Sequence, residues 1–232
     1  MLSSQLIKNI TSQISLVGDL SDDVLIEFCI IANQKYRIGS PIISDEDYDF
    51  IFLHELAKRL PNHPFLKKVE DEIEGFSEEK IKLPQKMLST DKAYSWEEVN
   101  KWLERVTKFS SDINYLLADI QIKGTAKLDG FAGYDDGNKL YTRGDGNKGS
   151  DISRVFERGL GVFNNSERGQ GPGEIVVKRS YFEKYLSNHF EYPRNFQASL
   201  IKEKELDKLA IDAISAKAAL FVPFNQLPHW LG

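Results

Sequence analysis

The chain has 232 residues, of which 41% are hydrophobic and 28% are charged, and its formal net charge is −5. This length and apolar content can bury one large core or two unequal ones. The acidic balance excludes a basic surface with which these residues alone could grip a long duplex, and no apolar run approaches the length of a membrane span. Because the N-terminus also lacks a signal-peptide pattern, we expect a soluble, cytoplasmic protein.

The first quarter of the chain is predicted to be a small helical unit. Ser21, followed by two acidic residues, is typical of a helix start, and the apolar run of residues 24–32 continues the helix. This run contains Cys29, the single cysteine of the chain, which therefore has no partner for a disulfide or a cysteine metal site. We interpret Cys29 as a core residue of a protein in a reducing compartment.

A second helix is predicted to begin at Ser44, with Asp47 as its capping-box partner. Asp45, Tyr48 and Asp49 share one face of this helix because they stand at positions i, i+3 and i+4. Two carboxylates that flank an aromatic ring can hold a ribose or an amide and stack a planar heterocycle. The alternative is that both acids serve only the helix N-terminus while Tyr48 packs inward.

Residues 70–86 are polar and acidic, which is typical of a linker or a domain edge. We place a boundary near residue 75, with a helical domain over residues 1–75 and a second domain over residues 76–232. No internal repeat or low-complexity tract interrupts either part.

The second domain is predicted to be a sheet with inserted helices, so the chain as a whole belongs to the α+β class. Residues 95–98 form a capping box that opens a helix. Its buried stripe is expected to contain Val99, Trp102, Leu103 and Val106. The pattern of residues 115–123 then indicates a strand that leads toward Lys127.

The central motif of the sequence is Lys127-Leu128-Asp129-Gly130. At the end of an apolar strand, Lys127 and Asp129 would lie on one face, and Gly130 would let the backbone turn closely past its neighbours. An amine beside an acid is what a covalent lysine nucleophile needs. Taken alone, this four-residue pattern is more simply interpreted as a surface Lys-x-Asp pair before a turn glycine. The surrounding motifs therefore have to discriminate between a surface pair and a nucleophile.

Two loops follow the central motif. Residues 135–138 indicate a turn between the strands 131–134 and 139–142. Residues 142–149 form a glycine-punctuated loop with Arg143 and Lys148, which can bring backbone amides and a guanidinium against phosphate or can be a simple surface turn.

The remaining segments are predicted in chain order. They are a loose segment over residues 164–173, a strand over 174–179, a loop over 193–195, a helix over about 204–219 and a last apolar segment over 220–224.

Read together, these segments resemble the adenylation region of NAD-dependent DNA ligases. The resemblance covers residues 20–224 and depends on motifs at residues 44–49, 87–89, 127–130, 142–146, 173–176 and 193–195. ATP-dependent ligases, RNA ligases and capping enzymes share the Lys-x-Asp-Gly signature. The Ser-Asp-x-x-Tyr-Asp element before it and the Thr-Arg-Gly-Asp-Gly loop after it point to the NAD-using branch.

The resemblance implies a helical domain followed by a nucleotidyltransferase domain of antiparallel sheets with flanking helices. It also implies that Lys127 attacks NAD, forms lysyl-AMP and releases nicotinamide mononucleotide (NMN), with Mg²⁺ present and Asp129 orienting the nucleophile. AMP would later pass to the 5′-phosphate of nicked DNA.

The resemblance also assigns the cofactor-binding residues. Glu174 would bind the AMP ribose, Leu88 and Ser89 would lie by the adenine, Arg143 and Arg194 would face phosphate, and Tyr36, Asp45, Tyr48 and Asp49 would hold the NMN half.

The sequence also departs from the family pattern. Thr125 stands where an acid is usual, Lys35 replaces one of two aromatic residues, and Lys202 lies where a second arginine is expected. These departures keep a second hypothesis open, in which the chain is a non-catalytic nucleotide- or partner-binding module with the ligase fold.

The family's later Asp-Gly-Val-Val-Ile-Lys strand, OB-fold, zinc finger, helix-hairpin-helix and BRCT parts do not occur in these residues. We therefore expect one subunit of a ligase split over two polypeptides, in a bacterial or phage-infected cell, whose partner chain carries the remaining strands and the DNA clamp. The alternatives are an excised or inactive fragment, or a part of a longer chain.

Overall fold

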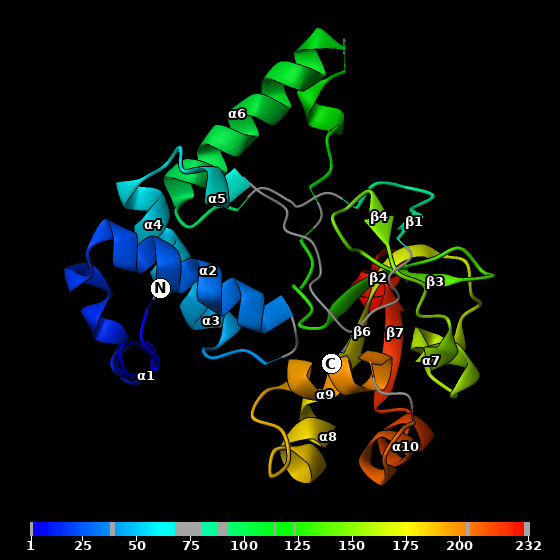
Figure 1. Ribbon diagram of the computed structural model, residues 1–232. Coiled ribbons are helices and arrows are strands. Elements are labelled where there is room, and N and C mark those ends of the chain that lie inside the picture. Colours follow the sequence, from blue (N-terminus) through cyan, green and yellow to red (C-terminus); the bar gives the residue numbers. More distant parts are fainter. Residues whose placement is uncertain are drawn as a thin grey trace. The chain divides into compact units, whose positions relative to one another are not determined.

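The computed structural model describes residues 2–37, 40–67, 80–87, 92–113, 115–122, 124–202 and 205–229 (Figure 1). Residues Met1–Leu88 and Lys127–Gly232 form one compact unit, and residues Ser89–Ala126 form another. Helices and mainly antiparallel sheets make up the chain, so the predicted α+β class is confirmed. The predicted boundary near residue 75 falls within residues 68–79, outside the described residues, and stays a prediction.

The N-terminal segment is helical. Its elements are α1 (Ser4–Ser12), η1 (Ile14–Asp19), α2 (Asp22–Arg37), α3 (Asp45–Asp47), the π-helical η2 (Tyr48–Leu53), α4 (His54–Arg59) and α5 (Pro64–Lys67). Leu25, Phe28 and Phe52 are completely buried in the core of this segment. Cys29 is also buried there, as predicted, and burial raises the pKa of its thiol to about 12.

The predicted cap of the second helix is confirmed. The Ser44 hydroxyl accepts a hydrogen bond from the Asp47 backbone N–H at 3.0 Å and donates one to the Asp47 carboxylate at 2.7 Å. This cap fixes the start of α3 and therefore the position of Asp45, the first residue of that helix.

The second half of the large unit is built on a five-stranded sheet with the order β3-β2-β6-β7-β5. Its strands are β2 (Phe131–Asp135), β3 (Leu140–Thr142), β5 (Gly161–Val162), β6 (Gly171–Val177) and β7 (Ala219–Pro223). A separate pair joins β1 (Ile81–Lys82) to β4 (Lys148–Gly149). The predicted turn between β2 and β3 is confirmed, and Gly137 adopts a φ of 94° there, which favours glycine.

Short helices pack against this sheet. They are α7 (Arg154–Glu157), η4 (Phe163–Asn165), α8 (Arg179–Tyr181), η5 (Phe182–Leu186), α9 (Pro193–Lys202), α10 (Lys208–Ser215) and η6 (Phe224–His229). α9 contacts β2 and β6, and α10 contacts β7 (Figure 1). Phe131, Ile175, Phe196 and Phe221 form the centre of this second core.

The predicted strand before Lys127 is wrong. Residues 115–122 contain the short helix η3 (Leu117–Asp119), and residues 124–129 form no strand. A strand needs neighbours for its backbone N–H and C=O groups, and the pairing of β2 with β6 begins only at Phe131. Lys127 and Asp129 therefore lie in an irregular segment just before β2.

Three further predictions are corrected downstream. Residues 193–195 do not form a loop but open α9, because Pro193 takes the first helical position, where its missing N–H has no intrahelical role. β6 begins at Gly171, so the last residues of the predicted loose segment already pair with β2. The predicted helix over 204–219 is shorter, because Asp207 caps α10 by accepting from the Ala210 N–H.

Residues Ser89–Ala126 contain α6 (Trp96–Asp112), and the predicted capping box of Ser95 and Glu98 is confirmed. The expected buried stripe of this helix is only half-buried. Ser110 is the one buried residue of α6. Within the described part of the chain, no helix has both the length and the apolar content needed to cross a membrane.

Candidate nucleotide site

The Lys127 side chain is exposed at the end of the irregular segment 124–129. Gly130 follows in close contact with β6: a Cβ atom at this position would lie 2.2 Å from the Ile175 carbonyl oxygen and 2.7 Å from Cγ of Glu174. Only glycine fits this approach, because side-chain atoms do not come that close to backbone oxygens. The expectation that Gly130 passes closely by its neighbours is confirmed, and this approach sets the end of the Lys127–Gly130 motif against Glu174.

Glu174 lies on β6, where it pairs with Ala132 of β2 and with Val222 of β7. Burial raises the pKa of its carboxyl group to about 7, although the charges of Arg194, Lys127 and Arg143 oppose this shift. The positive charges of these three residues therefore act on the Glu174 carboxylate. The site combines a lysine amine, two guanidinium groups and an acid that titrates near neutral pH.

Arg194 lies in the first turn of α9 and is almost completely buried. Its guanidinium donates to the backbone carbonyl of Gly130 and, at 3.1 Å, to that of Tyr36. The same group lies over the rings of Tyr36 and Phe131, 3.8 and 4.0 Å from their centroids. These contacts link α2 to the Lys127–Gly130 motif, and the predicted role of Arg194 at phosphate stays a prediction.

The N-terminal helices contribute Tyr36 and Asp45 to the same site. The Tyr36 hydroxyl donates to the Asp45 carboxylate at 3.1 Å, and the Asp45 and Asp129 carboxyl groups share a hydrogen bond. The pKa of Asp129 is raised, first by loss of solvent around its carboxyl group and next by the charge of Asp45. Both causes favour the neutral form of the Asp129 carboxyl group.

The other two predicted residues of this helix are half-buried on η2. The Tyr48 hydroxyl donates to the backbone carbonyl of Cys29 at 3.3 Å, which agrees with the inward-packing interpretation. The predicted roles of Tyr48 and Asp49 at the NMN half stay predictions. Leu88 and Ser89, expected near the adenine, lie outside the described residues.

Arg143 is half-buried at the start of the glycine-punctuated loop, and its backbone N–H donates to the Ala132 carbonyl. Gly144 and Gly146 have φ values of 53° and 88°, so both positions favour glycine. The Asp145 carboxylate accepts from the N–H groups of Asn147 and Lys148, which lowers its pKa. The charge of Arg143 at the start of the loop acts on Glu174, while the Asn147 and Lys148 amides are already bonded within the loop.

Residues 76–205 match the family model described as the NAD-dependent DNA ligase adenylation domain. The chain belongs to this family. It is 63% identical to a DNA ligase of Ruthia magnifica over 93% of its own length, 62% identical to one of Vesicomyosocius okutanii over its whole length, and 50% identical to one of Shewanella baltica over 93%. The chain spans only 33–37% of the length of these three relatives.

The resemblance to NAD-dependent ligases is thereby confirmed, and the candidate site contains a residue that the sequence did not reveal. Gln197 is completely buried on α9, and its side-chain N–H donates to the Asp129 carbonyl at 2.9 Å. The available signal was the i, i+3 spacing of Arg194 and Gln197, which places both on one helix face once α9 is recognised. In the described structure, the buried side-chain oxygens of Asn195 and Gln197 have no hydrogen-bond partner.

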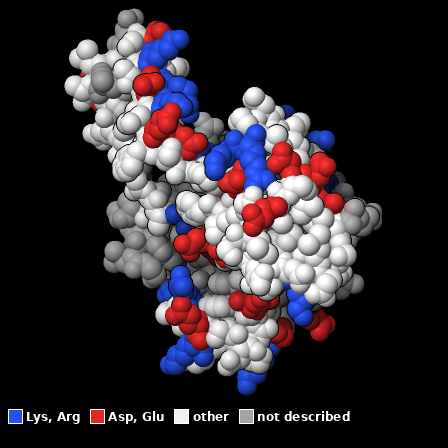
Figure 2. Space-filling model, turned by 90° about the vertical axis from the view of Figure 1, so that its left-hand side faces the viewer, with Lys and Arg blue, Asp and Glu red and all other residues white. Residues whose placement is uncertain are grey.

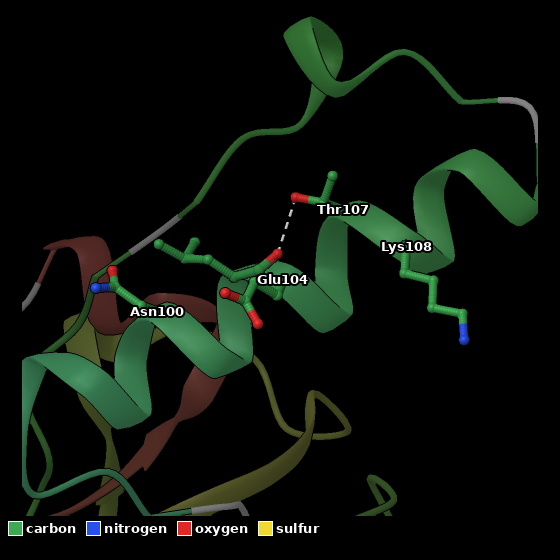
Figure 3. A pocket seen from close by; sticks show the side chains of 5 residues that line it. Asn100, Glu104, Thr107 and Lys108 are labelled. Atoms are coloured by element: carbon green, nitrogen blue, oxygen red, sulfur yellow. Dashed lines mark hydrogen bonds between the residues drawn. The ribbon is translucent and has the colours of Figure 1, made fainter.

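The unit Ser89–Ala126 has a shallow hollow on α6 (Figure 3). It is lined by Asn100, Leu103, Glu104, Thr107 and Lys108. The Thr107 hydroxyl donates to the Leu103 carbonyl at 2.9 Å, a contact within the helix itself. The hollow contains none of the predicted site residues.

The described residues also do not fit a resident metal ion. They contain no group of three or more His, Cys, Asp or Glu side chains placed to hold one. A magnesium ion in this ligase family member would therefore need oxygen ligands other than such a cluster, and the phosphates of a bound nucleotide are the usual source.

Proposed function

We propose that Lys127 takes AMP from NAD as the first step of DNA ligation. The Lys127 amine forms a bond to the adenylyl phosphorus, the P–O bond to the NMN half breaks, and NMN leaves with that electron pair. The amine loses its proton to solvent, so a lysyl-AMP phosphoramidate remains. The observation that carries this proposal is the close approach of Gly130 to Glu174, which puts exposed Lys127 three residues from a point of contact with an acid on which Arg143 also acts.

The neighbouring groups have distinct roles in this proposal. Arg143, with Mg²⁺ carried by the nucleotide phosphates, offsets the charge that develops on the phosphoryl oxygens and favours the neutral amine. Glu174 binds the ribose of AMP, and Asp129 orients the nucleotide. Tyr36, Asp45, Tyr48 and Asp49 hold the NMN half, and Leu88 and Ser89 lie by the adenine.

We further propose that nick sealing requires segments beyond these 232 residues, supplied by a second polypeptide. The net charge of −5 supports the need for further segments, because a DNA clamp needs a basic excess. Figure 2 shows basic and acidic side chains close together on the face that it presents. The chain would thus prepare AMP, and the partner would grip the nicked DNA.

The test is incubation of the chain with NAD labelled in its adenylyl group and with Mg²⁺, with and without the remaining segments of a relative such as the Shewanella ligase. We expect the label to remain on the chain through a denaturing gel. Acid treatment should release it, because the P–N bond of a phosphoramidate is acid-labile. Lys127→Ala should abolish the label, whereas Lys184→Ala, an exposed lysine of η5, should leave it unchanged. Absence of label under every condition would instead support a non-catalytic module.

A further inference from the structure

We propose that Gln197 is a positioning residue for AMP transfer, which acts by fixing the backbone of the Lys127–Gly130 motif. This inference rests on the proposed function and adds a residue to it. Gln197 contacts the motif only through the Asp129 carbonyl in the described structure, so it is not assigned to the reacting atoms themselves.

The motif needs an external support because it lies outside the sheet. Residues 124–129 form no strand, and the pairing of β2 starts at Phe131. The backbone carbonyls of Asp129 and Gly130 are instead bonded by two side chains of α9, Gln197 and Arg194. Because these stand one helical turn apart, α9 holds two consecutive peptide groups of the motif in register.

α9 is itself firmly fixed. At its C-terminal end, Arg154 donates to the carbonyls of Ile201 and Lys202, and Arg158 donates to that of Leu200. These arginines bind helix carbonyls that have no partner within the helix, as a C-terminal cap does. The position of the Gln197 amide is therefore set by the core and not by the motif that it contacts.

A purely structural role does not account for a glutamine at this position. Gln197 is completely buried, yet its side-chain oxygen has no partner within the described structure. An unsatisfied buried acceptor lowers stability, and an apolar side chain of the same length would remove that cost. The amide is useful here for its N–H group, which binds the Asp129 carbonyl. This bond fixes the local backbone and thereby the direction of the Lys127 and Asp129 side chains.

The test is Gln197→Met in the full chain. Three quantities are measured: the single-turnover rate of label transfer from saturating NAD, the Kd for NAD and the melting temperature. We expect the rate to fall about tenfold or more, as small displacements of reacting groups do. The Kd should stay within about twofold. The melting temperature should change little, because the variant removes the unsatisfied Gln197 oxygen but leaves the Asp129 carbonyl without its donor. Gln197→Asn has a side chain one methylene shorter, so its amide should not reach the Asp129 carbonyl and its rate of label transfer should fall similarly. This variant tests the positioning role if Gln197→Met does not fold.

The matched control is Ser199→Ala on the same helix. Its hydroxyl donates to the Phe196 carbonyl within α9 and does not contact the motif in the described structure. This variant should transfer label at the original rate. A Gln197→Met chain that is labelled as fast as the unchanged chain, or that loses NAD affinity and not rate, would overturn the positioning role. An unchanged chain that takes no label would overturn the proposed function instead.

Discussion

Glu174 is the residue whose ionisation is most affected by its place in the fold. It stands on a central strand, and burial raises its pKa from an ordinary value of 4.5 to about 7. Arg194, Lys127 and Arg143 lower the pKa, but burial has the larger effect. At neutral pH the carboxyl group is therefore divided between its neutral and charged forms, which makes the charge of the whole site sensitive to pH.

This shift predicts a pH dependence of stability. An acid whose pKa is raised on folding stabilises the folded state below its ordinary pKa, and that stabilisation is lost as the pH rises through the folded value. Between pH 4.5 and about 7, Glu174 should reduce the free energy of unfolding by up to about 3 kcal/mol. Urea unfolding of Glu174→Gln without NAD should lack this loss.

The matched control is Glu183→Gln, which removes an exposed acid paired with Arg179 on the surface. Its pH profile should follow that of the unchanged chain. If Glu174→Gln also follows it across this pH range, then the Glu174 pKa is not raised.

At the scale of elements, the sequence predicted best where the signals are local. The caps at Ser44 and Ser95 and the turn between β2 and β3 all depend on residues within four positions of one another, and each is confirmed. The strand before Lys127 was wrong because its fate depends on partner strands far along the chain. The same holds for Gln197, whose bond to Asp129 spans 68 residues.

The segment predicted as loose, residues 164–173, is another case of a long-range contact. Arg168 forms a bidentate ion pair with Asp135 at the end of β2, with N–O distances of 2.7–2.9 Å. The Asp135 side chain is only 1% exposed, and the Arg168 guanidinium lies 3.7 Å from the centre of the Phe156 ring. This pair holds the segment against the sheet, 33 residues away in sequence.

Arg168→Met should therefore destabilise the chain by about 3 kcal/mol, because it leaves a buried carboxylate without its cation. The N–H groups of Gly137 and Gly169 still donate to Asp135, which keeps the loss at the lower end for a broken buried pair. Arg179→Met, which breaks the exposed pair with Glu183, should cost less than about 1 kcal/mol. Equal midpoints of urea unfolding for the two variants would show that the Asp135 pair contributes no more than a surface pair.

At the scale of the whole molecule, two hydrophobic cores supply one site. The helical core contains Phe28 and Phe52, and the sheet core contains Phe131 and Phe196. The sequence motifs predicted that residues from both parts act together, and Tyr36 and Asp45 do meet Asp129 and Arg194. The precise partners were not predictable, because each motif indicates a residue type and not the contact that it makes across the fold.

The Asp45–Asp129 pair gives a direct test of this meeting of the two parts. The charge of Asp45 and its hydrogen bond both raise the pKa of Asp129, after loss of solvent as the main cause. Asp45→Asn should therefore lower the pKa of Asp129, since Arg194 and Lys127 still favour the charged form. The measurement is a ¹³C NMR titration of the Asp129 carboxyl group.

The pH dependence of the free energy of unfolding should change together with the Asp129 pKa. A raised pKa stabilises the folded chain below the ordinary aspartate value of about 4, and this contribution is lost at higher pH, so Asp45→Asn should weaken that loss. Glu46→Gln is the control, because Glu46 is an exposed neighbour on α3 and is not among the causes of the Asp129 shift. An Asp129 midpoint that Asp45→Asn leaves in place would mean that Asp45 does not act on the central motif, and the two cores would then contribute to the site independently.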